Sequence, residues 1–258
     1  MWNPFDFTGK KIVVTGASSG IGRATAVKLS QQGAAVFIIG RNEERLKETV
    51  SLMSGEGHRY YIKDLSEDGS VREIYDDIVS DGSKIDGLVY CAGITRVIPV
   101  NMLGKKSMEE SITVNLYSFS EMTGLLSKKK YHNKASIVGI SSIAARYPQK
   151  CQGAYVAAKA AMNAMVSSMA IELADKDMRI NSVMPGSVNT EMLRSAFEGK
   201  TDDEIRRALS CQVLGLSEPE DIADVIMFLL SDASRMITGR EIYADGGYLH
   251  FFAEQSGT

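Results

Sequence analysis

Short apolar segments alternate with longer amphipathic segments along the 258 residues of the chain. The apolar segments are rich in Val and Ile and only a few residues long, which predicts strands that are buried on both faces. The longer segments repeat apolar residues every three or four positions, which predicts helices that cover a sheet. This alternation is typical of an α/β fold, in which helices pack on both faces of a parallel sheet.

The expected elements follow one another without a linker or an internal repeat. Strands are predicted over residues 11–15, 35–39, 59–62, 87–90, 136–140, 179–183 and 241–243. Helices are predicted over residues 21–32, 43–53, 68–80, 107–127, 153–175 and 219–230. We therefore expect one domain over residues 1–258, with a single-domain Rossmann-type doubly wound fold and a sheet of about seven strands.

The stretch 192–217 breaks this rhythm and is interpreted as a flap over a substrate site. Its apolar residues Met192, Leu193, Ala196 and Phe197 would then enclose a substrate chain. The alternative interpretation is that they form the buried face of a short helix.

Composition and charge exclude several classes of function. The chain has 44% hydrophobic and 24% charged residues, as ordinary globular proteins do. Its net charge of −3 gives no basic field that would attract nucleic acid or an anionic membrane. Cys91, Cys151 and Cys211 are widely spaced, so neither a disulfide framework nor a metal site is expected. The N-terminal residues show no secretion signal, and a cytoplasmic location is the expectation.

A glycine-rich loop joins the first expected strand to the first expected helix. It reads Thr-Gly-Ala-Ser-Ser-Gly-Ile-Gly over residues 15–22, with glycines at Gly16, Gly20 and Gly22. At a helix N-terminus, unpaired N–H groups and the helix dipole favour a phosphate, and glycine lets the phosphate come close. The spacing differs from Gly-x-Gly-x-x-Gly, so a tight turn is the alternative when the loop is considered alone.

The end of the second expected strand bears on the choice of cofactor. A carboxylate there would bind a free ribose 2′-hydroxyl, whereas an arginine favours a 2′-phosphate. The chain has Arg41 at this point, which predicts NADP(H) rather than NAD(H). The alternative is a solvated arginine in the turn before Asn42.

Tyr155 and Lys159 are four residues apart in an expected helix, so their side chains share one face. Free tyrosine has a pKa of about 10, and a cation at about 4 Å could lower this pKa toward neutrality. The phenol could then exchange a proton with a substrate oxygen. Considered alone, the pair is weak evidence, because tyrosine and lysine recur at this spacing by chance.

Taken in order, these motifs resemble those of the short-chain dehydrogenase/reductase family, from Lys10 to Gly247. The resemblance implies catalytic roles for Asn115, Ser142, Tyr155 and Lys159, with Ser141 as the competing assignment for Ser142. It implies a cofactor site made of Gly16, Ser18, Ser19, Gly20, Ile21, Gly22, Arg41, Asp64, Leu65, Ala92, Gly93, Tyr155, Lys159, Pro185, Gly186, Val188 and Thr190.

The resemblance also implies how these groups act. Tyr155 would be the proton donor, Ser142 would hold the substrate oxygen, and Asn115 would support a water relay to Lys159. Because asparagine is a poor helix former, a kink near Asn115 is an alternative that does not exclude the relay. The chain departs from the family where Asn-Asn-Ala-Gly is common and residues 90–93 read Tyr-Cys-Ala-Gly. A hydrogen-bonding support behind the cofactor is therefore expected to differ.

Within the family, the chain most resembles 3-oxoacyl-(acyl-carrier-protein) reductases. The expected substrate is a small ketone or alcohol or an acyl thioester. Acyl carrier protein is the expected partner for the thioester, and it would meet the lysines at 128–130. Those lysines also suit a solvated helix end. A sugar-like ketone and a non-catalytic nucleotide sensor are the alternatives. Residues 154–174 are small or apolar around most of the helix, which predicts a homotetramer or homodimer.

Overall fold

Seven parallel strands form one sheet in the computed structural model, which describes residues 3–67 and 70–248. The strands are β1 (Lys11–Thr15), β2 (Ala35–Gly40), β3 (Arg59–Ile62), β4 (Ile85–Tyr90), β5 (His132–Ile140), β6 (Arg179–Pro185) and β7 (Glu241–Ala244). Their order is β3-β2-β1-β4-β5-β6-β7, with Val13 of β1 opposite Phe37 of β2 and Leu88 of β4. Successive strands are added toward one edge of the sheet up to β3 and toward the other edge from β4 onward, so the strand order reverses between β1 and β4. Ligands of such folds bind at this point. The predicted α/β fold is confirmed.

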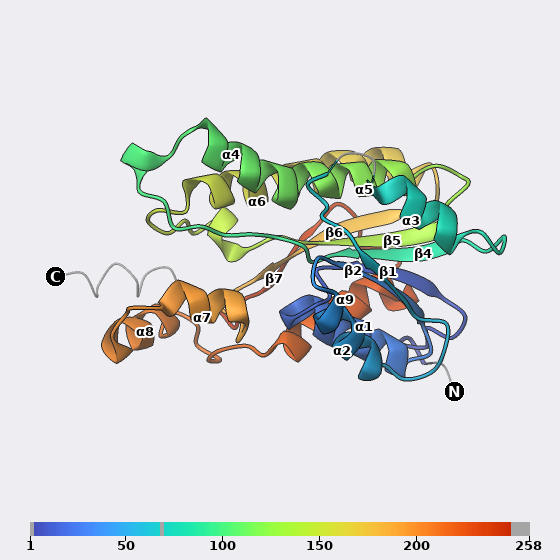
Figure 1. Cartoon of the computed structure of the whole chain (residues 1–258), viewed down its shortest axis with the longest axis horizontal. Coiled ribbons are helices and arrows are strands. Elements are labelled where there is room, and N and C mark those ends of the chain that lie inside the picture. Colours follow the sequence, from blue (N-terminus) through green and yellow to red (C-terminus); the bar gives the residue numbers. More distant parts are fainter. Residues whose placement is uncertain (1–2, 68–69, 249–258) are drawn as a thin grey trace.

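Helices cover both faces of this sheet (Figure 1). One layer contains α1 (Gly20–Gln31), α2 (Glu43–Ser51) and α9 (Pro219–Leu230), and the other contains α3 (Ser70–Ile78), α4 (Lys105–Ile112), α5 (Ser118–Leu126) and α6 (Gly153–Ala174). Each layer has its own apolar core, around Leu29 and Ile226 on one face and around Phe119 and Met162 on the other. The expected start of the third helix at residue 68 lies outside the described residues. Short 3-10 helices cover Val100–Met102, Ile143–Ala145 and Asp232–Ser234.

The expected helix over residues 107–127 is not continuous. A π-helical segment, Thr113–Tyr117, separates α4 from α5. Asn115 lies at its centre and is fully buried. The helix is therefore irregular at Asn115, the position for which a kink was one alternative.

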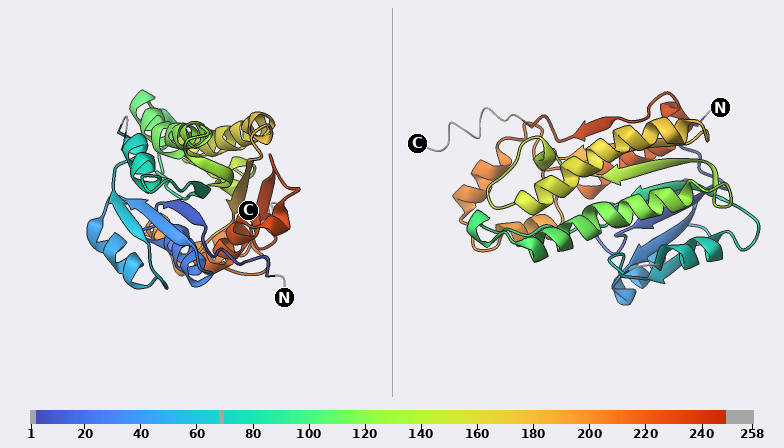
Figure 2. Two further views of the ribbon diagram at one scale, coloured as in Figure 1. Left: turned by 90° about the vertical axis from the view of Figure 1, so that its right-hand side faces the viewer. Right: turned by 90° about the horizontal axis from the view of Figure 1, so that it is seen from above.

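Two further helices lie beside the carboxyl ends of the strands, α7 (Glu191–Phe197) and α8 (Asp202–Leu209) (Figures 1 and 2). Thr190 caps α7, and a capping box of Thr201 and Glu204 begins α8. Throughout 191–197 and 202–209, which are all described, no residue is buried. The alternative of a buried helix face is therefore wrong for Met192, which is 42% exposed.

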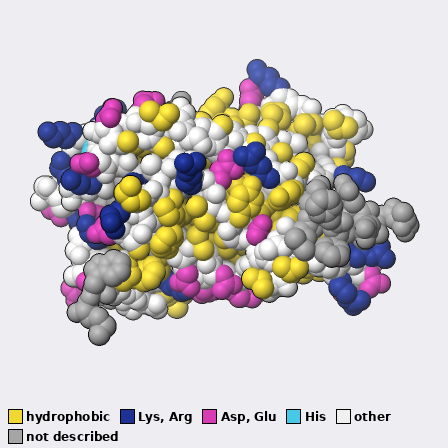
Figure 3. Space-filling view, turned by 180° about the vertical axis from the view of Figure 1, so that it is seen from behind, with side chains coloured by type: hydrophobic (Ala, Val, Ile, Leu, Met, Phe, Trp, Pro, Cys, Tyr) yellow, Lys and Arg dark blue, Asp and Glu magenta, His cyan; other side chains and the backbone are white. Residues whose placement is uncertain are grey.

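One edge of the molecule carries apolar groups that no other described element covers. Within residues 3–67 and 70–248, β7 pairs with β6 alone, and Tyr243 on it is half-exposed. On α6, Met162 and Val166 are buried, whereas the opposite side exposes Ala160 and Ile171. Figure 3 shows hydrophobic side chains gathered across the middle of the face seen from behind. In the described part of the chain, no helix has the length and apolar character that crossing a membrane requires.

Candidate active site

A cavity of about 1010 Å³ follows the carboxyl ends of the strands. Residues that follow β2 and β3 line the cavity, and so do residues that follow β5 and β6. Because these strands lie on opposite sides of the sheet, the cavity extends across it. Every cofactor residue expected from the sequence lines this cavity, as do Ser142, Tyr155 and Lys159. Asn115 does not line it, because its amide lies one layer behind, next to Gly93.

The glycine loop has the backbone geometry that close approach to a ligand requires. Gly16 and Gly20 have φ angles of +65° and +52°, which only glycine adopts readily. A Cβ atom on Gly22 would lie 2.5 Å from the carbonyl oxygen of Gly16, so a side chain is excluded there. The N-cap Ser19 makes no side-chain hydrogen bond to α1, and its first turn holds no acidic residue. The helix N-terminus is therefore open to an anion.

Ion pairs surround the part of the cavity that follows β2 and β3. Arg41 lies 3.8 Å from the carboxylate of Asp64, and its side chain is 69% exposed. Arg45 on α2 forms a 2.6 Å ion pair with Glu191 on α7, and all four residues line the cavity. Arg41 and Asp64 were expected from the sequence, whereas Arg45 and Glu191 were not. No local pattern could have found this second pair, because Arg45 and Glu191 are far apart in the chain.

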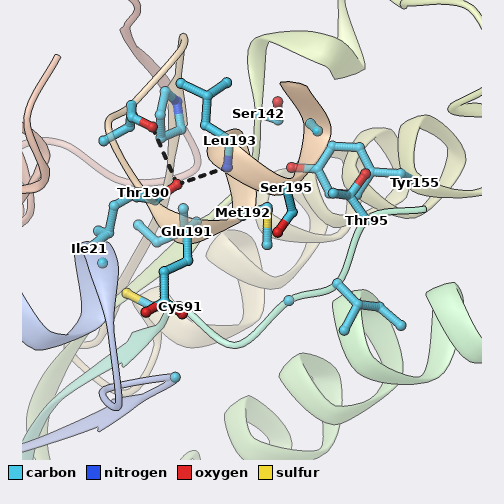
Figure 4. Close-up of a pocket in the computed structure, with 18 of the residues that line it drawn as sticks. Ile21, Cys91, Thr95, Ser142, Tyr155, Thr190, Glu191, Met192, Leu193 and Ser195 are labelled. Atoms are coloured by element: carbon cyan, nitrogen blue, oxygen red, sulfur yellow. Dashed lines mark hydrogen bonds between the residues drawn. The ribbon is translucent and has the colours of Figure 1, made fainter. Parts of the chain in front are cut away.

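Tyr155 is directed into the cavity, with Ser142 and Thr95 on either side of it (Figure 4). The hydroxyl of Ser142 faces the same cavity as the Tyr155 phenol and caps the 3-10 helix Ile143–Ala145 by accepting from Ala144 N at 3.1 Å. The hydroxyl of Ser141 instead lies 3.2 Å from the backbone oxygen of Lys159 and is buried. This geometry favours Ser142 over Ser141 as the serine that meets a substrate.

Lys159 is 4% exposed and donates a 2.7 Å hydrogen bond to the carbonyl oxygen of Ile140. Its Nζ lies 5.7 Å from the centroid of the Tyr155 ring. Burial lowers the pKa of Lys159 to about 8, and the electrostatic interaction with the neighbouring Cys91 acts in the opposite direction and is smaller. Burial also raises the pKa of Cys91, which therefore stays a neutral thiol.

The pKa of Tyr155 is raised, which corrects the expectation that Lys159 lowers it. Burial of the phenol is the larger effect, and the Ser142 hydroxyl opposes it. The expectation considered the charge of Lys159 and left out the burial of the phenol. The Lys159 ammonium donates to the oxygen of Ile140, with its Nζ 5.7 Å from the centroid of the Tyr155 ring. The phenol is consequently held in its protonated form at neutral pH.

Asn115 connects the π-helical segment to the loop after β4. Its Nδ2 donates to the oxygens of Ile94 and Ser111 at 3.0 and 2.9 Å, and its Oδ1 accepts from Ile94 N at 3.2 Å. A Cβ atom on Gly93 would lie 2.8 Å from Asn115 Oδ1 and 3.4 Å from Lys159 Nζ. The amide and the ammonium therefore flank the same glycine.

Gln212 holds the end of the flap segment against the loop at Ser187, and no sequence motif pointed to it. Its side chain is buried and spans two backbone segments. Its Oε1 accepts from Ser187 N at 2.8 Å, and its Nε2 lies within 3.2 Å of Ser187 O and 2.6 Å of Gly215 O. Thr190 lies on the same loop, and a Cβ atom on Gly20 would lie 3.1 Å from it. The glycine loop and the base of the flap therefore meet across the cavity.

These residues fit a bound dinucleotide. The open N-terminus of α1 and the glycines would hold its phosphates, and Arg41 with Asp64 would meet its adenosine. Tyr155, Lys159 and the loop at Pro185 would surround its nicotinamide end. A fold and a cavity of this kind define a dinucleotide-dependent oxidoreductase of the Rossmann type.

Comparison with known proteins agrees with that class. A family model described as Enoyl-(Acyl carrier protein) reductase matches residues 16–249. The chain is 33% identical to the 3-oxoacyl-(acyl-carrier-protein) reductase of Thermotoga maritima, over 93% of this chain and 97% of that protein. It is 32% identical to the (3R)-3-hydroxyacyl-CoA dehydrogenase of Canis lupus familiaris, over 96% and 99%. It is 33% identical to the L-xylulose reductase of Caenorhabditis elegans, over 95% and 97%.

Among solved structures, a short-chain type dehydrogenase/reductase from Mycobacterium ulcerans superposes with a TM-score of 0.85. The two chains are 29% identical, and the match covers 94% of this chain and 90% of that one. The protein belongs to the short-chain dehydrogenase/reductase family, whose members bind NAD(P) and interconvert CH–OH and C=O groups.

Proposed function

We propose that this protein is an NADP(H)-dependent reductase of 3-oxoacyl thioesters, with the acyl chain carried on coenzyme A or on an acyl carrier protein. The observation that carries the proposal is that Tyr155 and Ser142 face the same cavity as the glycine loop. A proton donor and a hydrogen-bond donor thus lie where a dinucleotide would place its hydride. Relatives with thioester substrates support this choice.

The proposed chemistry needs one proton and one hydride. When bound, dihydronicotinamide supplies the hydride to the carbonyl carbon. Tyr155 gives its proton to the carbonyl oxygen, and Ser142 holds that oxygen by a hydrogen bond. Burial raises the pKa of Tyr155, which keeps the phenol protonated but weakens it as an acid, so the phenolate needs a nearby cation as it forms. Lys159 then stabilises the phenolate that is left, and Asn115 supports the loop beside Lys159.

Three cations favour the NADP(H) part of the proposal. Arg41, Arg45 and Lys63 all line the part of the cavity that follows β2 and β3. A 2′-phosphate there would gain charge-assisted hydrogen bonds. Asp64 pairs with Arg41 and Glu191 pairs with Arg45. A 2′-phosphate must therefore displace these carboxylates from the two arginines for the protein to prefer NADP(H).

The flap supports an acyl substrate. Met192, Leu193 and Phe197 line the cavity although none of them is buried. An acyl chain would cover these apolar side chains, and α7 would close over it as the predicted flap. The second candidate is a sugar-like ketone, which Gln149, Lys150 and Gln152 favour by adding polar groups to the same cavity. A non-catalytic nucleotide sensor is less well supported, because it would not require Ser142 and Tyr155 to share the cavity.

A substrate screen tests the proposal. Purified protein is given NADPH and, in separate reactions, 3-oxoacyl thioesters of increasing chain length, sugar-like ketones, simple ketones and enoyl thioesters. We expect NADPH oxidation with the 3-oxoacyl thioesters and a kcat/KM that rises with chain length, because the flap is apolar. Faster turnover of sugar-like ketones than of thioesters would contradict the proposed thioester substrate and favour a sugar-like ketone. NADPH binding without oxidation of any compound would favour the sensor.

We also propose that the protein assembles as a homodimer or homotetramer. β7 is an edge strand, and edge strands with exposed apolar side chains tend to pair with another chain. The exposed side of α6 lies near this edge, with small residues that allow close helix contact. Both features are explained when a second copy covers them.

A further inference from the structure

The π-helical segment Thr113–Tyr117 displaces backbone carbonyls from their usual helical donors, so side chains can bind them. Three side chains do so in this structure, each to a different carbonyl oxygen around the segment. They are Asn115 Nδ2 to Ser111 O at 2.9 Å, Ser118 Oγ to Thr113 O at 2.9 Å and Tyr90 Oη to Val114 O at 2.5 Å.

Tyr90 is the contact that comes from outside the helix. It is the last residue of β4 and is fully buried, with its ring 5.5 Å from that of Phe119 on α5. The ring packing fixes where the hydroxyl lies, and the hydroxyl donates to the residue directly before Asn115. Val114 also lines the cavity, so the segment that Tyr90 holds separates the core from the active site.

Asn115 responds to any shift of this segment. Its amide makes two hydrogen bonds to the backbone of Ile94 and lies beside Gly93, where Lys159 Nζ also approaches. Displacement of the segment by a few tenths of an ångström would change both hydrogen bonds to Ile94 and the contact with Gly93. Tyr90 and Ile94 are both on the chain that leaves β4, so the strand holds the π-helical segment from both sides.

We infer that Tyr90 is a positioning residue for Asn115, and that it acts by anchoring the carbonyl of Val114. The expected effect of Tyr90 on turnover rests on the proposed function. The structural part of the inference concerns the Asn115–Ile94 contact and can be tested whatever the substrate is.

The test compares Tyr90→Phe with Tyr75→Phe. Both changes delete one hydroxyl from a fully buried tyrosine in the same layer, and Tyr75 donates to Met122 O at 3.3 Å, away from the π-helical segment. Hydrogen exchange at the Ile94 amide reports whether Asn115 Oδ1 still accepts from it. We expect exchange there to rise about fivefold in Tyr90→Phe, the factor for the loss of one buried hydrogen bond. Amides in β5, such as Val138, report loss of global stability.

Turnover provides the second readout. We expect Tyr90→Phe to lower kcat about fivefold without changing KM for NADPH, and to have no further effect on kcat when Asn115 is already alanine. Unchanged exchange at Ile94 in Tyr90→Phe, or an equal rise in Tyr75→Phe, would overturn the inference. If the unaltered protein oxidises no NADPH with any substrate, the proposed function fails while the exchange comparison still decides the role of Tyr90.

Discussion

Replacement of Lys159 by methionine tests the electrostatics of the site through folding stability. Lys159 is almost completely buried, and its pKa falls from 10.5 to about 8. One unit of pKa corresponds to about 1.4 kcal/mol, so burial of the charged form costs about 3 kcal/mol. Methionine has a similar length and no charge. The variant removes this cost, and it also loses the hydrogen bond to Ile140.

The pH dependence separates these two effects. Below pH 8 the lysine is protonated in both the folded and the unfolded chain, and the full cost is present. Between pH 8 and 10.5 the folded chain loses the proton while the unfolded chain keeps it, so stability rises with pH. The free energy of unfolding of the unaltered protein should therefore gain about 3 kcal/mol relative to Lys159→Met across this interval.

Urea unfolding at closely spaced pH values measures this difference. Other groups titrate in both proteins, so their contributions cancel when the two curves are subtracted. Lys106→Met is the matched control for replacing lysine by methionine, because Lys106 is exposed on α4. A difference curve for Lys159→Met that does not rise between pH 8 and 10.5 would refute the claim that Lys159 is a buried charge with a lowered pKa.

Three further predictions concern the cofactor, the flap and the assembly. Arg41→Ala should raise KM for NADPH about tenfold and leave KM for NADH unchanged, since it removes a charge-assisted contact to the 2′-phosphate; an equal change for both cofactors would count against this contact. Gln212→Ala should lower the free energy of unfolding by about 2–3 kcal/mol, because it removes the hydrogen bonds of a buried amide to Ser187 N, Ser187 O and Gly215 O. Gln149→Ala, at an exposed position that lines the cavity, should change the free energy of unfolding by less than about 0.5 kcal/mol, and equal losses would contradict the role of Gln212. Light scattering should give a mass of two or four times 28.1 kDa, and Ile171→Lys should reduce it; a single species of 28.1 kDa would disprove the assembly.

Strand positions could be predicted closely because buried parallel strands are apolar throughout. The bounds of β1 and β3 match the expectation. β4 begins at Ile85, earlier than expected, and includes Asp86. An aspartate usually argues against a strand. Here its carboxylate accepts from Lys11 N at 2.9 Å on the neighbouring strand, a contact that local sequence cannot show.

The chemistry of the site was predictable only in part. The glycine loop and the Tyr155–Lys159 spacing are local patterns, so their residues could be named in advance. The π-helical segment depends on donors from distant parts of the chain, such as Tyr90. The direction of the pKa change at Tyr155 depends on burial and on where Lys159 points, and neither is encoded in the spacing of the two residues.

The central claim is that Tyr155 supplies the proton when a ketone is reduced. Single-turnover reactions of NADPH with a 3-oxoacyl thioester test it in the unaltered protein and in Tyr155→Phe, with NADPH binding measured separately by fluorescence. The account predicts that the variant binds NADPH normally and oxidises it at least about 100-fold more slowly, the contribution expected of a general acid. Oxidation by Tyr155→Phe at the rate of the unaltered protein would contradict the account.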